Sequence, residues 1–345
     1  MSTPTTTDAE SLIENLDRKG PMHHFHNAVH KYPWISPAIV LLVAVIIFGL
    51  INERFWAISN LSLITQQVSI VGALAVAQTL VILTAGIDLS VGAVAVLSSM
   101  VMAKTAAEQG VPGPIALLLG FAVGAAAGAL NGFLITKLKL PPFIVTLGTL
   151  SIFMAVTLIY ATGRTINSDK MGEAANVLLW LGNPLQVGSF KITYGVVMML
   201  LLYIFFSWVL KNTAWGKHVY AVGDDPAAAS LAGIRVGRVL FSVYLVGGIV
   251  LAIAGWIAIG RVGSASPTIL PDANLESITA VVIGGTSLFG GRGTMFGTLI
   301  GAILVGVVSN GLVLAGLDQA YKVLAIGILV IVSVALDQWI RKVRS

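Results

Sequence analysis

The sequence contains no cysteine and little charge. Of its 345 residues, 20 are Lys or Arg and 15 are Asp or Glu, 10% in all, whereas a soluble domain carries about 25% charged residues. Hydrophobic residues make up 57%, and the mean hydropathy is +0.92. The missing cysteine excludes disulfides, thiol catalysis and thiolate metal sites. Because so few charges cannot cover the surface of a soluble fold of this size, we predict an integral membrane protein.

Several chemical signatures are also missing. No Gly-x-x-x-x-Gly-Lys-Ser/Thr loop occurs, so the chain has no such loop to hold a nucleotide. There is no His-Glu-x-x-His, and the basic residues form no stripe with interleaved aromatics. We therefore predict no enzyme activity, no catalytic residue, no metal site, no cofactor in this chain and no nucleic-acid partner.

The apolar residues form runs of about the length that crosses a membrane as a helix. We predict an all-α polytopic protein with about ten transmembrane helices, two of which, 89–102 and 277–289, are short and have glycine close by. The predicted spans are Trp34–Ile51, Leu63–Thr84, Leu89–Met102, Pro114–Ile135, Phe143–Ala161, Tyr194–Leu210, Val239–Ile259, Ser277–Phe289, Met295–Ala315 and Val323–Ile340.

The domain plan is a polar N-terminal tail, 1–33, followed by one transmembrane domain, 34–345. Loops on the cytoplasmic side of a membrane carry an excess of Lys and Arg. With ten spans and a cytoplasmic N-terminus, thirteen of the 20 Lys and Arg residues lie inside and seven outside. This bias predicts that both termini are cytoplasmic.

The fourth span carries a glycine every four residues, at Gly120, Gly124, Gly128 and Gly132. Such a ridge favours close helix packing in lipid. Asn131-Gly132 in this span and Asn310-Gly311 in the ninth are five spans apart, which indicates a possible inverted repeat. A competing alignment pairs residues 85–92 with residues 284–291.

Asp88 is an acidic residue flanked by apolar ones, and it is either a helix N-cap or a functional site. An ion-coupled secondary transporter would need such a group. Weakly polar residues could line a path for a neutral, hydroxyl-rich solute or hydrogen-bond one helix to another. They are Gln66, Gln67, Gln78, Thr79, Thr84, Asn131, Thr146, Thr149 and Asn310.

The polar segment 211–238 contains a short helix with both ends marked. Asp225 suits the N-cap, Pro226 the first helical position and Gly233 a left-handed stop. Asp224 adds negative charge near the positive end of the helix. About two turns need something to pack on, so this is either a helix lying on its own protein or a docking element for a partner protein.

Four stretches together resemble the ribose-type permeases of bacterial ABC importers. They are residues 86–92 (GIDLSVG), 141–148 (PPFIVTLG), 223–233 (GDDPAAASLAG) and 283–293 (IGGTSLFGGRG). The resemblance implies a type II importer fold, a bacterial inner membrane, a permease homodimer, a separate cytoplasmic ATPase that binds ATP-Mg, and an external sugar-binding protein. The branched-chain amino-acid permeases share the fold and are the alternative.

The resemblance also assigns roles to residues. Residues 224–233 match the helix that couples a permease to its ATPase, and residues 283–293 match a segment near the pore and its cytoplasmic mouth. The resulting coupling residues are Asp224, Asp225, Pro226, Ala229, Leu231 and Gly233. The candidate translocation path comprises Asp88, Asn131, Thr146, Thr149, Gly284, Gly285, Thr286, Ser287 and Asn310.

Overall fold

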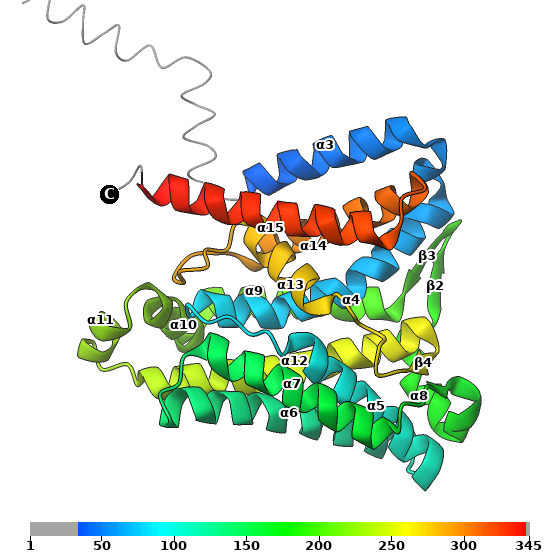
Figure 1. The fold of residues 1–345 in the computed structure, drawn as a ribbon, viewed down its shortest axis with the longest axis horizontal. Helices are drawn as coiled ribbons and strands as arrows, with labels where there is room; N and C mark the ends of the chain where they lie inside the picture. The colour runs from blue at the N-terminus through cyan, green and yellow to red at the C-terminus, as the bar shows by residue number, and fades with distance from the viewer. Residues whose placement is uncertain (1–33, 343–345) are drawn as a thin grey trace, which may run out of the picture.

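The computed structural model describes residues 34–342 (Figure 1). The predicted N-terminal tail, 1–33, lies outside the described residues. Seven helices in the described part are long and apolar enough to cross a membrane: α4 (Ile58–Leu83), α5 (Val91–Gln109), α6 (Gly113–Lys137), α7 (Pro142–Ala161), α9 (Tyr194–Asn212), α12 (Val236–Val262) and α14 (Met295–Leu314). Three further helices have shorter apolar stretches: α3 (Ile35–Ile51), α13 (Ala273–Ile283) and α15 (Gln319–Lys342).

Each predicted span overlaps one of these helices, but several boundaries differ, and the ends of the two short spans differ most. The predicted span 277–289 ends as a helix at Ile283, because Gly285, Gly290 and Gly291 have positive φ angles that interrupt a right-handed helix. The predicted short span 89–102 is instead α5, which runs on to Gln109 and ends at Gly110 in the left-handed region. The polar residues near the end of α5 hid its last two turns.

Small elements complete the chain between the long helices. β2 (Pro184–Val187) and β3 (Phe190–Thr193) form an antiparallel hairpin, and β1 (Ile166–Asn167) pairs with β4 (Ser264–Ala265). The remaining short elements are η1 (Glu53–Trp56), η2 (Ser168–Ala174), α8 (Ala175–Leu178), η3 (Trp180–Gly182), α10 (Ala214–Asp224) and α11 (Pro226–Leu231). The β2–β3 hairpin and α11 lie at opposite ends of the long helices, so we call these the hairpin end and the α11 end (Figure 1).

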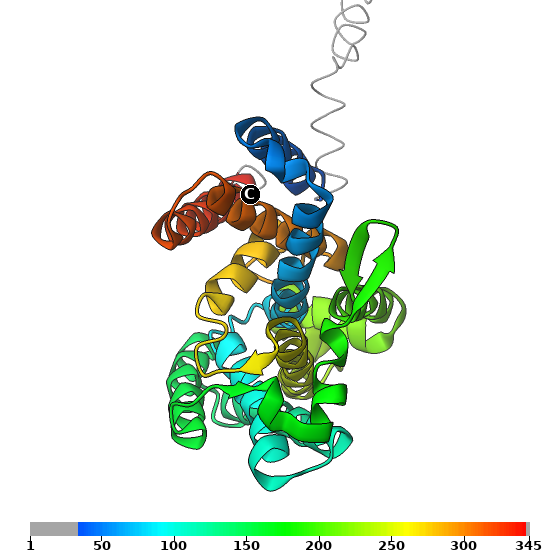
Figure 2. The same ribbon diagram turned by 90° about the vertical axis from the view of Figure 1, so that its right-hand side faces the viewer.

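The helix contacts repeat with an offset of five helices. α5 contacts α6 and α7, as α13 contacts α14 and α15, while α12 contacts α6 as α4 contacts α14. α6 runs from the hairpin end to the α11 end and α14 runs the opposite way (Figure 1). Viewed from the hairpin end, α4 and α12 lie between one group formed by α5, α6 and α7 and a second group formed by α13, α14 and α15 (Figure 2). This arrangement agrees with the alignment of Asn131-Gly132 and Asn310-Gly311, rather than with the alignment of residues 85–92 and 284–291.

Glycines on α6 face the main chain of α12. A Cβ atom at Gly124 would overlap the Gly248 carbonyl oxygen, and one at Gly128 would overlap the Tyr244 carbonyl oxygen. Gly132 lies against Phe241 of the same helix, with its Cβ position 3.2 Å from the Phe241 Cα atom. Such close backbone approach supplies van der Waals packing in lipid, where burial of apolar surface gives no net driving force.

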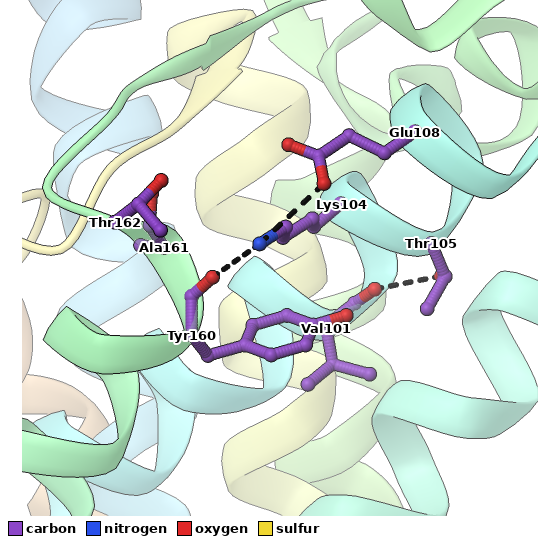
Figure 3. Close-up of polar contacts among 7 residues, drawn as sticks. All are labelled: Val101, Lys104, Thr105, Glu108, Tyr160, Ala161 and Thr162. Atoms are coloured by element: carbon purple, nitrogen blue, oxygen red, sulfur yellow. Dashed lines mark hydrogen bonds and ion pairs between the residues drawn. The ribbon is translucent and has the colours of Figure 1, made fainter.

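Lysines join helices at the hairpin end. The Lys104 ammonium of α5 lies 3.4 Å from the Glu108 carboxylate, donates to the Tyr160 carbonyl of α7, and sits 4.6 Å from the centre of the Tyr160 ring (Figure 3). In the group of α13, α14 and α15, the Lys322 ammonium of α15 lies 2.7 Å from the Glu276 carboxylate of α13. Each group of three helices therefore has a lysine that connects two of its helices.

Candidate functional site

Three chain segments meet at the α11 end: the end of α4, the end of α10 and the loop after α13. The Gly291 amide donates to the Leu83 carbonyl across 3.0 Å. A Cβ atom at Gly223 would overlap that same carbonyl oxygen and would lie 2.7 Å from the Gly291 nitrogen. Gly291 has φ +69°, and its own Cβ position lies 2.8 Å from the Asp224 Cα atom. Only main chain fits at this junction.

α11 projects from this junction as the outermost element of its end (Figure 1). The Asp225 carboxylate accepts hydrogen bonds from the Ala227 and Ala228 amides at 2.8 and 3.0 Å, and Gly233 has φ +84°. The predicted cap and left-handed stop are therefore confirmed. Ala229 is 4% exposed and packs inward, whereas Leu231 is 91% exposed. The helix presents an apolar side chain that nothing in the described chain covers.

Asp224 is placed differently from the prediction. It is the last residue of α10, so its carboxylate lies at the C-terminal end of that helix as well as before α11. Only Asp225, whose backbone is extended at φ −150°, separates the two helices. The favourable charge predicted for α11 is thus offset, because the C-terminal end of α10 is the negative end of its dipole.

The sequence prediction missed α10, which joins α11 to the spanning helices. Val219 and Val222 are buried on one face. The Trp215 indole donates to the Ser242 hydroxyl of α12 across 2.8 Å, and the Tyr220 hydroxyl donates to the Gly293 carbonyl across 2.8 Å. Burial raises the pKa of Tyr220 above its ordinary value.

A signal for α10 was present in the sequence. Val219 and Val222 have helical spacing, and Thr213 stands where an N-cap residue would. The Thr213 hydroxyl accepts from the Gly216 amide across 3.1 Å. The basic and glycine residues of the segment, which favour a loop, obscured this pattern.

Candidate path residues surround the loop between α4 and α5, residues 84–90. The Asp88 carboxylate accepts from the Ser90 amide and hydroxyl at 2.7 and 2.6 Å, and the Asn131 amide of α6 donates to the Ser90 hydroxyl oxygen across 2.9 Å. The Thr146 hydroxyl of α7 donates to the Ile87 carbonyl across 2.9 Å. Asp88 is not the N-cap of α5, because that position is Ser90. Its carboxylate instead fixes the turn that leads into the helix.

Other candidate path residues lie elsewhere. Asn310 of α14 forms two reciprocal amide hydrogen bonds with Asn60 of α4, at 2.9 and 3.1 Å, which join helices near the hairpin end. Among residues 34–342, Thr149 donates only within its own helix, to the Thr146 carbonyl at 3.4 Å. These bonds fit the alternative in which weakly polar residues hold helices together.

The segment after α13 folds against the start of α14. Gly284 lies against Gly297, with its Cβ position overlapping the neighbouring main chain, and Gly285 turns the chain with φ +85°. Thr286 is buried, and its hydroxyl has no hydrogen-bond partner among residues 34–342. The Ser287 amide donates to the Arg292 carbonyl across 2.9 Å, which closes the loop onto itself.

The four stretches singled out in the sequence are thus connected. Residues 141–148 hold the loop 84–90 through Thr146, and that loop follows directly from Leu83, which binds Gly291. The main chain at Gly223 lies against both Leu83 and Gly291. The end of α10, which leads into α11, is therefore in close main-chain contact with the end of α4 and the loop after α13.

Comparison with known proteins decides the family. A family model described as the permease component of the branched-chain amino acid transport system matches residues 60–334. The chain belongs to this permease family. The permease is 50% identical over 325 residues to the fructose import permease protein of Rhizobium meliloti, covering 94% of this chain and 89% of that one. No solved structure matches it.

Two other relatives also have names that refer to sugars. The permease is 38% identical over 328 residues to the ribose import permease protein of Bacillus subtilis, covering 94% of this chain and 98% of the relative. It is 33% identical over 308 residues to the D-allose transport system permease protein of Escherichia coli, covering 88% and 91%. Family membership and the apolar helices together make the permease a multi-pass transport subunit of the membrane.

Proposed function

We propose that this permease forms the translocation path of an ATP-driven importer for a monosaccharide in a bacterial inner membrane. The sugar import permeases that resemble it over most of their length support the substrate class. The amino-acid alternative has weaker support, because the three relatives described above carry sugar names. Since the sequence lacks a Gly-x-x-x-x-Gly-Lys-Ser/Thr loop, hydrolysis of ATP-Mg belongs to a separate subunit.

The α11 end faces the cytoplasm in this proposal, and α11 is the element that docks the ATPase. The observation that carries the docking role is the exposed Leu231 on a capped helix whose base is joined to the ends of α4 and α13. Burial of this apolar side chain in a groove of the partner would stabilise the complex, because it removes apolar surface from water. The distribution of Lys and Arg supports the orientation.

The hairpin end faces outward in this proposal, where an external binding protein delivers the sugar. A second copy of the permease completes the path. These two partners rest on the resemblance to the ribose-type importers.

The test is to co-purify the permease with its ATPase and to compare Leu231→Ala with Leu50→Ala. Leu50 is 83% exposed on α3, so the control removes the same atoms from an equally exposed site far from α11. We expect Leu231→Ala to release the ATPase or weaken its stimulation, while Leu50→Ala retains both.

Two further variants change the shape of α11 without removing Leu231. Asp225→Ala removes a cap worth about 1 kcal/mol, and Gly233→Val places a β-branched residue at positive φ. Sugar uptake and ATPase stimulation by the loaded binding protein should fall together, more severely for Gly233→Val. If all three variants retain the ATPase and its stimulation, α11 is only a surface helix and docking must be sought in 136–142 or 290–293.

A further inference from the structure

A cavity of about 310 Å³ opens at the hairpin end, between α4, the end of α12, α13, α14 and α15 and the loop before α13. Its lining contains none of the candidate path residues around the loop 84–90. Gln319 and Asp272 lie toward the exposed rim, whereas Leu74 and Val305 are each 1% exposed and form part of its inner wall. The volume lies at the lower end of the range for small-molecule sites, about 300–1,000 Å³.

The charges that line the cavity balance. Arg261 and Lys322 supply two positive charges, and Asp272 and Glu276 supply two negative ones. Both carboxylates are engaged: Glu276 pairs with Lys322 at 2.7 Å, and Asp272 accepts from the Gln319 amide at 2.7 Å. Because the lining carries no net charge, it favours a neutral solute over a cation or an ammonium group.

Other polar groups in the lining remain available. The half-buried side chain of Gln67 lines the cavity, and within residues 34–342 the buried Ser309 hydroxyl oxygen has no hydrogen-bond partner. Such a buried group is costly unless water or a ligand satisfies it, by roughly 1–3 kcal/mol. Because an amide and a hydroxyl can each donate and accept, they suit the hydroxyl groups of a sugar. Leu74 and Val305 form an apolar wall against which the C–H groups of a sugar ring could pack.

We propose that this cavity is a binding site for one monosaccharide inside the permease, with Gln67 and Ser309 as ligand-contacting residues. This inference rests on the proposed function, in which the hairpin end faces the external binding protein. A sugar leaving that protein would meet a charge-balanced pocket before it reaches the loop 84–90. The pocket would then select among solutes in addition to the selection made by the binding protein.

The test is equilibrium binding of radiolabelled D-fructose, D-ribose and D-allose to the purified full-length permease in lipid nanodiscs, with L-leucine as the zwitterionic comparison. We expect at least one sugar to bind saturably and L-leucine not to compete. Gln67→Leu should raise the dissociation constant about tenfold, since loss of one buried hydrogen bond costs on the order of one decade. Ser309→Ala should raise it by a smaller factor.

Gln109→Leu is the control. Gln109 is the exposed last residue of α5, and it does not line the cavity. The dissociation constant of this variant should stay within about twofold of wild type, because a surface change away from the ligand has little effect. Gln67→Asn, which keeps the amide but shortens it, provides a second reading if Gln67→Leu does not fold.

The outcomes separate the site from the proposed function. Absence of saturable sugar binding, equal effects of Gln109→Leu and Gln67→Leu, or displacement by L-leucine would each overturn the site. Import is measured separately in proteoliposomes with the ATPase and the binding protein. A wild-type complex that imports no sugar overturns the proposed function, whereas sugar binding that depends on Gln67 would still establish the cavity as a sugar site.

Discussion

Two sets of contacts at opposite ends of the permease differ in their chemistry. At the α11 end, Leu83, Gly223 and Gly291 meet through main chain, with no side chain between them. At the hairpin end, α5 and α7, and likewise α13 and α15, are joined by long charged side chains, with a cavity beside one of the ion pairs. Main-chain contacts cannot adjust without moving whole segments, whereas lysine and glutamate side chains can rotate. In the proposed function, the main-chain junction at the α11 end would transmit a displacement of α11, and the hairpin end would admit the solute.

The largest effect should come from adding a side chain at the α11 junction. Gly223→Leu places a branched side chain against the Leu83 carbonyl and the Gly291 amide. We expect a loss of stability of about 3 kcal/mol or more, because neither neighbour can move alone. Thermal unfolding and uptake would measure it. Gly148→Leu is the control, since nothing lies within 4 Å of its Cβ position; equal losses in both variants would show that the junction is not tightly packed.

The next effect compares two glycines of the α6 ridge. A Cβ atom at Gly128 would overlap a carbonyl of α12, whereas one at Gly120 would overlap the flexible side chain of Met102. Gly128→Ala should therefore cost about 2–3 kcal/mol, and Gly120→Ala less than about 1.5 kcal/mol because methionine can change rotamer. Thermal unfolding in one detergent compares the two. The reverse order would contradict the contrast between main-chain and side-chain packing.

A smaller effect tests the two lysine ties of the hairpin end. Glu276→Gln leaves the Lys322 ammonium, 18% exposed, without its carboxylate, and should cost about 1–3 kcal/mol. Glu108→Gln should cost less than about 1 kcal/mol, because Glu108 is 53% exposed and Lys104 keeps its contacts with Tyr160. The measurement is thermal unfolding at low and high salt. If both variants lose equal stability, the Lys322–Glu276 pair beside the cavity contributes no more to stability than the exposed Lys104–Glu108 pair.

The smallest effect on stability should come from Leu231→Ala. A surface substitution changes stability by no more than about 0.5 kcal/mol, and Leu231 is 91% exposed. Its unfolding temperature should match wild type even where its attachment to the ATPase is lost. A clear drop in that temperature would mean that α11 is part of the fold's own core contacts.

Composition and periodicity by themselves determined that the chain crosses a membrane many times as helices, because apolar runs and a shortage of charge leave few other folds. Local chemistry also determined the cap at Asp225 and the turn at Gly233, since both depend on neighbours along the chain. The helical character of α10 was open to the same local reasoning, but its basic and glycine residues concealed it.

Only the tertiary structure decided which residues meet. Asn131 and Asn310 occupy similar places in two helices, yet one supports the turn at Ser90 and the other pairs with Asn60. Residues 85–92 and 284–291 resemble each other in sequence, and the fold brings their neighbourhoods together through Leu83 and Gly291 instead of relating them as repeats. The cavity beside Gln67 and Ser309 is lined by residues of five helices, so no single stretch of sequence contains it. Hydrogen bonds and cavities form between segments distant in the chain, and periodicity along one helix does not specify which partner it will face.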